Sequence, residues 1–115
     1  MSKPDEASRA ARVRELNDAF RKAPRSLGKL CLTRSTAALP LGAQLAILHR
    51  VMTFDAFTEE NDPYQEHKFG AFEYKDEKIL WRIDYYDLAC EYGSDDPSDP
   101  TQTTRVMTIM LARED

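Results

Sequence analysis

The sequence has few cysteines and glycines, and it has no long apolar run. Its 115 residues include two cysteines and four glycines. Cys31 and Cys90 lie far apart and belong to no close pair, so we expect no disulfide framework. No window reaches the roughly 18 to 20 apolar residues of a membrane-spanning helix, and the start MSKPDEASRAAR lacks the apolar core of a signal peptide. We therefore expect a cytoplasmic protein with reduced thiols and no membrane segment.

Several catalytic and cofactor motifs are also missing. Ser94 follows Gly93, but no G-x-S-x-G surrounds it, and the sparse glycines form no phosphate-binding loop. The histidines, His49 and His67, are not paired with the cysteines at the spacing of a structural zinc site. Our first expectation is that the protein holds no cofactor, with a divalent metal as the alternative.

The composition is that of an ordinary globular domain. The chain is 42% hydrophobic and 31% charged, which is far from the composition of disordered chains. Residues 1–35 carry nine Lys or Arg against four Asp or Glu, and residues 36–115 carry seven against sixteen. Such asymmetry can mark a nucleic-acid-binding arm, but Glu15 and Asp18 interrupt the basic residues, as on a solvated helix face. We expect one domain over residues 1–115, with residues 1–4 disordered.

Apolar residues recur with helical spacing in two segments. The first helix is expected from about Asp5 to Ala23, because Pro24 cannot continue it. The second is expected to follow Pro40, with Ile47 widening its apolar face. The two stripes are Val13, Leu16 and Phe20 in the first helix, and Leu41, Leu45 and Leu48 in the second.

Alternating patterns predict strands. Residues 29–35 read as a short edge strand, and residues 51–57 as a further strand, although the second helix could extend into them. The clearest pattern is a hairpin over Phe69 to Tyr86, with its polar tip at 75–78. Residues 106–112 are apolar on both faces, which predicts a central strand. The expected class is α+β, with a mainly antiparallel sheet of four to five strands and two helices packed on one face.

Five runs of sequence resemble a known family. They are TFDAFT (53–58), NDPYQEHKFGAF (61–72), IDYYD (83–87), GSDDPSDP (93–100) and TRVMTIMLA (104–112). Together they resemble domain-of-unknown-function family 3768, from about Leu16 onward. The resemblance implies a small uncharacterised protein of alphaproteobacteria or their mobile elements, and it implies no particular activity.

The loop from Asn61 to His67 holds the most chemically suggestive residues. Asp62, Glu66 and His67 offer two carboxylates and an imidazole, which suit a hard metal or general acid–base work. With Asp84 they would complete a divalent-metal site for a hydrolase or nuclease, with Glu66 and His67 as its catalytic residues. The favoured alternative is structural: Asp62 caps a turn, Glu66 pairs with a cation and His67 orders the loop.

The connection 87–103 is longer than structureless loops usually are, so we expect it to be functional or flexible. Its carboxylates, held between two prolines, could imitate a phosphate backbone, although a solvated loop is the simpler interpretation. Taking both loops together, the residues that we expect to bind a partner are Asn61, Asp62, Glu66, His67, Tyr86, Asp87, Asp95, Asp96, Asp99 and Arg105.

Three functions remain as hypotheses. The first is a small non-enzymatic accessory protein, encoded on a phage or plasmid, that inhibits or modulates a host nucleic-acid-handling or defence complex by binding protein. The second is the metal-dependent hydrolase or nuclease. The third is weak nucleic-acid binding through Arg14, Arg21 and Lys22, which the acidic body of the protein disfavours.

Overall fold

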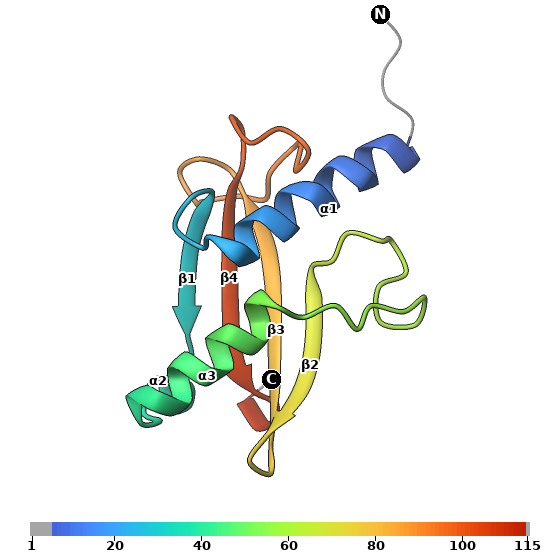
Figure 1. Ribbon diagram of the computed structural model, residues 1–115. Coiled ribbons are helices and arrows are strands. Elements are labelled where there is room, and N and C mark those ends of the chain that lie inside the picture. Colours follow the sequence, from blue (N-terminus) through green and yellow to red (C-terminus); the bar gives the residue numbers. More distant parts are fainter. Residues whose placement is uncertain (1–5, 115) are drawn as a thin grey trace, which may run out of the picture.

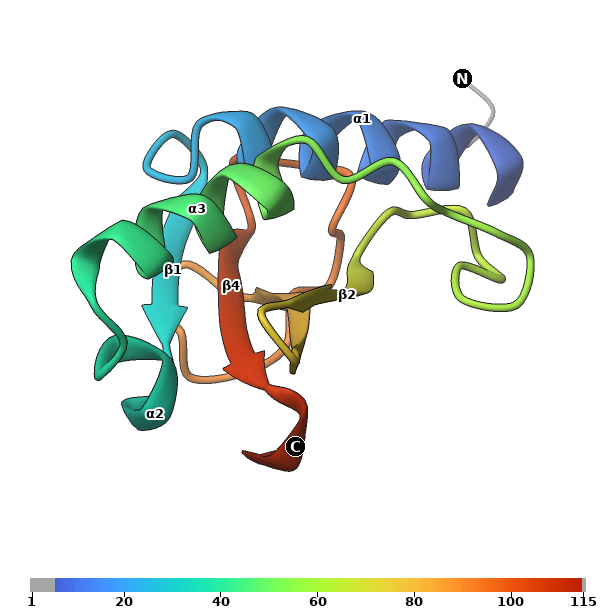
Figure 2. The ribbon, with the colours of Figure 1, turned by 60° about the horizontal axis from the view of Figure 1, so that its bottom comes forward.

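The computed structural model describes residues 6–114, so the expected disorder of residues 1–4 lies outside the described residues. The elements are α1 (Glu6–Lys22), β1 (Gly28–Leu32), α2 (Arg34–Ala37), α3 (Leu41–Met52), β2 (Phe69–Tyr74), β3 (Glu77–Tyr86), β4 (Thr104–Leu111) and the 3₁₀ turn η1 (Ala112–Glu114). The strands form one sheet in the order β1-β4-β3-β2. Both long helices, α1 and α3, lie on the same face of this sheet (Figures 1 and 2).

The sheet is mixed, not wholly antiparallel. Strands β2, β3 and β4 form an antiparallel meander, whereas β1 pairs in parallel with β4. The α+β class, the four strands, the two helices on one face and the central place of β4 are confirmed. The expected edge strand is also confirmed as β1, but it ends at Leu32, and α2 takes up the residues that follow.

The hairpin between β2 and β3 turns on two residues. Lys75 and Asp76 have φ of 45° and 67°, and Tyr74 pairs directly with Glu77. Two successive positive φ values are what a two-residue type I′ turn requires, and its twist suits the two strands that it joins. The tip is therefore shorter than the predicted 75–78, because Glu77 and Lys78 already belong to β3.

The core lies between the helices and the inner face of the sheet. Phe20 of α1 and Val51 of α3 pack with Trp81 and Ile109, and all four are fully buried. Gly70 of β2 passes directly beneath the indole, since a Cβ there would lie 2.3 Å from Trp81 Nε1. Only glycine lets β2 approach Trp81 this closely.

The strand predicted over residues 51–57 is wrong. Val51 and Met52 complete α3, and the chain then continues without regular structure to Phe57. The aromatic composition of this stretch has a different cause, because Phe54 and Phe57 pack edge-on against Trp81 at ring distances of 5.6 and 6.1 Å. Aromatic residues that cover a core from an irregular segment look like a strand in the sequence.

The apolar stripe predicted for the second helix does not form the centre of its buried face. Leu41 and Leu45 are 68% and 58% exposed, and the fully buried residues of α3 are Ile47 and Val51. Helix α3 is apolar on more than one side, so its periodicity alone does not identify the side that meets the sheet.

Candidate functional site

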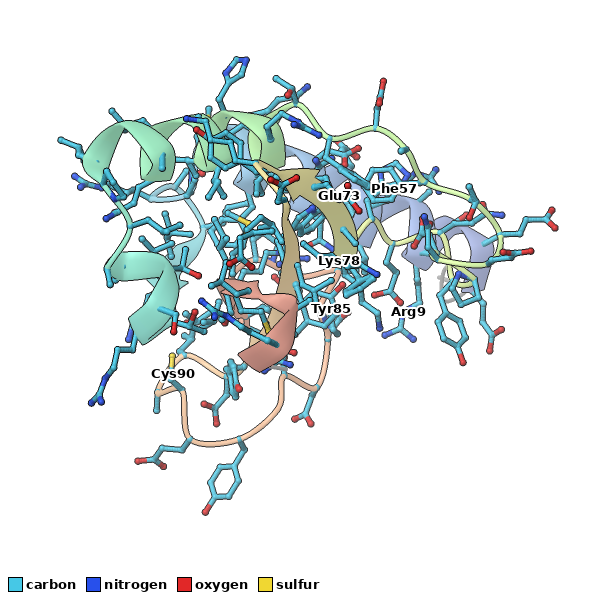
Figure 3. The ribbon with its side chains drawn as sticks, turned by 90° about the horizontal axis from the view of Figure 1, so that it is seen from below. Arg9, Phe57, Glu73, Lys78, Tyr85 and Cys90 are labelled. Carbon is cyan, nitrogen blue, oxygen red and sulfur yellow. The ribbon has the colours of Figure 1, made fainter. Side chains whose placement is uncertain are left out.

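The two long connections meet at one end of the sheet. The segment before β2 and the loop 87–103 after β3 both adjoin this end, and α1 crosses over it (Figure 1). The first half of loop 87–103, where Cys90 lies, runs on the side of the sheet away from α3 (Figure 3). Its second half returns toward α1, where Asp96 pairs with Arg9 at 3.3 Å.

Arg105 of β4 and Asn17 of α1 together link both connecting segments, the one before β2 and loop 87–103, to α1. Its side chain is fully buried, and Nε donates to Asn17 Oδ1 at 2.7 Å. Its Nη2 donates to the carbonyl of Pro97 at 2.6 Å, which fixes loop 87–103. The Asn17 amide in turn donates to the carbonyl of Glu66 at 2.9 Å, which fixes the other connection. A charged donor makes stronger hydrogen bonds than a neutral one, so Arg105 holds loop 87–103 firmly, while the neutral Asn17 amide holds the other connection.

Tyr85 completes the buried polar network (defined as Asn17, Glu66, Tyr85 and Arg105). Its hydroxyl donates to Glu66 Oε1 at 2.6 Å and accepts from Asn17 Nδ2 at 2.8 Å. The Arg105 guanidinium lies 5.2 Å from the centre of the tyrosine ring. Burial, followed by the hydrogen bond to Glu66, raises the pKa of Tyr85 far above its ordinary value. The phenol therefore stays protonated and keeps donating to Glu66 throughout the neutral range.

Burial has the opposite effect on the pKa of Arg105, the cation of the buried polar network. It lowers the pKa of the Arg105 guanidinium, while the nearby Tyr85 and Glu66 counteract the shift. One nitrogen of this group, Nη1, is buried without a hydrogen-bond partner among the described residues.

His67 is held by two carboxylates and one aromatic ring. Its Nδ1 lies 2.9 Å from Asp18 Oδ1, and its Nε2 lies 3.7 Å from Asp62 Oδ2. The imidazole stacks on Phe57 at 3.8 Å between ring centroids. Its backbone has a φ of 55°, and Asp62 Oδ1 accepts the amides of Glu66 and His67 at 3.1 Å each. Asp62 thus stabilises a strained turn, as the structural interpretation predicts.

An open groove separates α1 from the two connections. It has a volume of about 970 Å³. Its lining combines apolar and charged side chains, among them Arg9, Val13, Arg14, Tyr64, Lys68 and Pro97. The two connections thus meet beside α1, but most of the carboxylates that they bring are already bonded within the protein.

The acidic part of loop 87–103 is internally ordered. Asp96 accepts from the Ser98 amide and hydroxyl, and Asp99 accepts from Thr101 and Gln102. Hydrogen bonds from Ser98 lower the pKa of Asp96, and those from Thr101 lower the pKa of Asp99. Both carboxylates therefore stay ionised well into the acidic range.

Two other predicted residues shape turns. Asn61 Oδ1 accepts from the Thr58 amide at 2.8 Å, and its Nδ2 donates to the carbonyl of Ala56. Asp87 Oδ1 accepts from the Glu91 amide at 3.0 Å.

Tyr86 lies on the sheet face opposite the helices. It pairs with Thr104 and forms an isolated bridge to Gly93, which holds the start of loop 87–103 against β3.

The four residues of the alternative metal site do not converge. Asp84 alternates with Ile83 and Tyr85 and so faces away from the helices, where it binds Arg82 at 3.1 Å. Asp62 and Glu66 are engaged by backbone amides and by Tyr85. Across residues 6–114, no three His, Cys, Asp or Glu side chains are arranged to hold a metal ion.

The basic residues of α1 are dispersed. Arg21 is buried and donates to the carbonyls of Val51 and Phe54 at 2.9 and 2.8 Å. Arg14 donates to the carbonyl of Gln65, and Lys22 is exposed. The three cations that the third hypothesis assigned to nucleic-acid contact therefore do not form one surface. No helix among the described residues is long and apolar enough to cross a membrane.

Sequence reasoning missed Asn17 and Asp18, although the sequence contains a usable signal for the first. Asn17 lies four residues after Val13 and three before Phe20, within the apolar stripe of α1. A polar side chain on the buried face of a helix must find hydrogen-bond partners, and here these partners are the Glu66 carbonyl and the side chains of Tyr85 and Arg105.

The comparison with known families agrees with the resemblance in the loops. A family model described as protein of unknown function (DUF3768) matches residues 32–114. The chain belongs to this family. The DUF3768 match contains Glu66, Tyr85 and Arg105, whereas Asn17 precedes it, so the buried polar network joins the matched region to α1. No curated protein and no solved structure matches the chain.

Proposed function

We propose that this protein is a non-enzymatic accessory protein that binds another protein through loop 87–103. The observation that supports this proposal is the charge of the segment. Between Ile83 and Thr104 the sequence holds no Lys, Arg or His. It holds six carboxylates instead: Asp84, Asp87, Glu91, Asp95, Asp96 and Asp99.

The order of the loop favours binding over a purely solvated role. Arg105 holds the Pro97 carbonyl, and the hydroxyls of Ser94 and Thr103 lie 2.7 Å apart. The lowered pKa values of Asp96 and Asp99 keep their charges in place. A loop that is ordered before binding loses less conformational entropy when a partner docks, so more of the interaction energy remains as affinity.

The loop also carries side chains that can anchor a contact. Leu88 and Tyr92 are 66% and 73% exposed, and both lie within the acidic segment. Exposed tyrosines surrounded by polar groups are frequent anchors of protein interfaces. Apolar anchors within a ring of carboxylates suit a partner with a basic surface, such as a protein that binds nucleic-acid phosphates. The proposed effect is to inhibit or modulate such a complex.

The test is affinity capture from a lysate of the source organism. The tagged protein is compared with a Glu91→Lys, Asp95→Lys double variant, because neither side chain has a hydrogen-bond partner among the described residues and the loop should stay folded. A Glu59→Lys, Glu60→Lys variant makes the same charge change on another exposed turn.

We expect a stoichiometric partner with the wild type and with the second variant, and its loss with the first. Nucleic acid should compete with the captured protein for that partner. Equal capture by both variants, or the recovery of no stoichiometric partner, would contradict the proposal.

A further inference from the structure

The surface around β1 and α3 has the opposite character to loop 87–103. From Ala19 to Phe54 the sequence holds no Asp or Glu, although the whole chain holds 20. Arg25, Lys29 and Arg34 are exposed here, and none of them pairs with a carboxylate among the described residues. These three exposed cations are therefore not neutralised by a carboxylate of the protein.

The same surface is unusually apolar for an exposed one. Leu30, Leu41 and Leu45 are 36%, 68% and 58% exposed. Leu45 and Leu48 follow Leu41 at helical spacing on one side of α3, and Leu48 and Leu30 line a common groove of about 790 Å³. Scattered exposed leucines need no explanation, but a stripe that runs into a groove marks an interaction surface.

The groove follows the open edge of the sheet. Strand β1 pairs only with β4, and its other side faces outward (Figure 1). In this parallel pair Leu27 accepts from the Arg105 amide and Thr33 donates to the Ile109 carbonyl, so the odd-numbered residues of β1 bond to β4. The amides and carbonyls of Gly28, Leu30 and Leu32 therefore point away from the sheet.

Helices α2 and α3 shelter part of the outer edge of β1 and leave the rest of it open to a partner. Helix α2 and the start of α3 lie beyond β1, as Figures 1 and 2 both show. An added strand alongside β1 would lie next to the start of α3 (Figure 2), and Leu48 of α3 lines the same groove as Leu30. The unpaired backbone groups of an edge strand are a template for strand addition; the short length of β1 and Lys29 disfavour an unmatched strand, whereas a strand with carboxylates would neutralise Lys29.

We propose that β1 and α3 form a docking surface for an extended segment of a partner protein in which acidic side chains alternate with apolar ones. The segment adds to the sheet as a fifth strand next to β1. Its apolar side chains cover Leu30, Leu45 and Leu48, and its carboxylates meet Arg25 and Lys29. Such strand addition obtains affinity from backbone hydrogen bonds and specificity from alternate side chains.

Charge and backbone pairing distinguish this acidic segment from three other possible occupants of the surface: a second copy of the protein, an anionic membrane and a nucleic acid. A second copy would place the unneutralised cations of both molecules against each other, because neither β1 nor α3 contains a carboxylate. An anionic membrane or nucleic acid would satisfy the charge but would leave the outward backbone groups of Gly28, Leu30 and Leu32 without strand partners. The acidic extended segment satisfies the charge, the leucines and the backbone together. This surface shares no residue with loop 87–103, so it stands or falls independently of the proposed function.

The probe is a labelled synthetic peptide of about seven residues, the length of an ordinary strand, in which glutamate alternates with valine. Its counterpart carries lysine in place of glutamate. Fluorescence anisotropy measures both affinities, and amide hydrogen exchange by NMR reports on β1. We expect saturable binding of the acidic peptide, weaker binding of the basic one, and slower exchange of the Gly28, Leu30 and Leu32 amides in the complex.

Two variants and a control identify the surface. Arg25→Glu with Lys29→Glu should weaken the acidic peptide about tenfold, as the loss of two surface ion pairs implies, and should favour the basic peptide. Leu30→Pro removes one outward amide and should abolish binding without removing a β1–β4 hydrogen bond. Tyr64→Ala, a change of an exposed apolar side chain elsewhere, should leave binding unchanged.

Several results would overturn the proposal. They are equal binding of the two peptides, no binding of the acidic peptide up to millimolar concentration, or binding without protection of the three outward amides. Concentration-dependent dimerisation that competes with the peptide would assign the surface to a second copy instead. If Leu30→Pro does not fold, the charge-reversed variant, whose changes lie on exposed side chains, carries the same test.

Discussion

Replacing Tyr85 by phenylalanine removes one hydroxyl from the buried polar network. This hydroxyl donates to Glu66 Oε1 at 2.6 Å and accepts from Asn17 at 2.8 Å. A hydrogen bond to a charged group contributes about 1.5 to 3 kcal/mol and a neutral one about 1 kcal/mol. The Glu66 side chain is 21% exposed, so water can replace part of the lost interaction. We expect Tyr85→Phe to lower the free energy of unfolding by about 2 kcal/mol at neutral pH.

The same variant should change the response to alkaline pH. The phenol of Tyr85 ionises near pH 10 in the unfolded chain, whereas burial raises its pKa in the folded protein. Above pH 10 the unfolded state thus binds fewer protons than the native state, and the free energy of unfolding falls as the pH rises. While the native phenol stays protonated, this single group removes about 1.4 kcal/mol between pH 9 and pH 11.

Urea unfolding at pH 9 and pH 11 measures this contribution. Lysines and other groups also titrate in this range, so the comparison is between proteins at each pH. The wild type should lose about 1.4 kcal/mol more than Tyr85→Phe between the two pH values. Tyr92→Phe is the matched control, because Tyr92 is 73% exposed and should follow the wild type. If Tyr85→Phe and the wild type lose the same amount, the phenol is not held protonated and the reasoning is refuted.

Three further substitutions test the geometry. Asp62→Ala leaves the amides of Glu66 and His67 without their acceptor and should lower the free energy of unfolding, measured in urea, by about 2 kcal/mol. Asp62→Asn should recover part of this loss, and an unchanged stability of Asp62→Ala would contradict the structural role. Arg105→Met should lower it by about 3 kcal/mol, because Asn17 Oδ1 and the Pro97 carbonyl lose a charged donor, and a thermal denaturation midpoint equal to that of the wild type would exclude this. Asp76→Gly relieves a φ of 67° and should raise stability by about 0.5 kcal/mol, whereas a lower midpoint would contradict the type I′ turn.

The elements that the sequence predicted well are those that depend on local pattern. The β2–β3 hairpin alternates apolar and polar residues on both sides of a short polar turn, and the two strands lie next to each other in the chain. Strand β4 is apolar on both faces, which correctly indicated a central position. For the hairpin, residues close in the chain supply the pairing, so a short window contains most of the information; for β4 the burial of both faces is visible in its composition, although its partners β1 and β3 are distant.

The parallel pairing of β1 could not be predicted in this way. Strand β1 pairs with β4, and the helices α2 and α3 and the whole β2–β3 hairpin lie between them in the chain. Short links between later strands suggested an antiparallel order, but the position of β1 is set by contacts far apart in the sequence. Local periodicity indicates that a segment is a strand and carries no information about its partner.

The candidate site shows a similar limit for residue types. Asp62, Glu66 and His67 are the side chains of metal and acid–base sites, and they are close in sequence. In the structure the same chemistry stabilises a turn and a buried network, because backbone amides bind Asp62 Oδ1 and Tyr85 binds Glu66 Oε1. Arg105, expected to contact a partner, is fully buried. Residue type limits what a side chain can do, and its neighbours in space determine which of those roles it performs.

Helix α3 shows that the limits of local sequence pattern also affect how a surface is interpreted functionally. Its sequence offers two apolar stripes, and periodicity predicted Leu41 and Leu45 as part of the core. The sheet instead receives Ile47 and Val51, because the β-branched residues lie on the side that faces Trp81 and its neighbours. Leu41 and Leu45 are then left exposed beside an open strand edge in a region without carboxylates, while Leu48 packs partly against the core. Since burial of one stripe already accounts for the folding of α3, the exposed one is free to serve the docking of a partner, and mutations at Leu45 should affect binding more than stability.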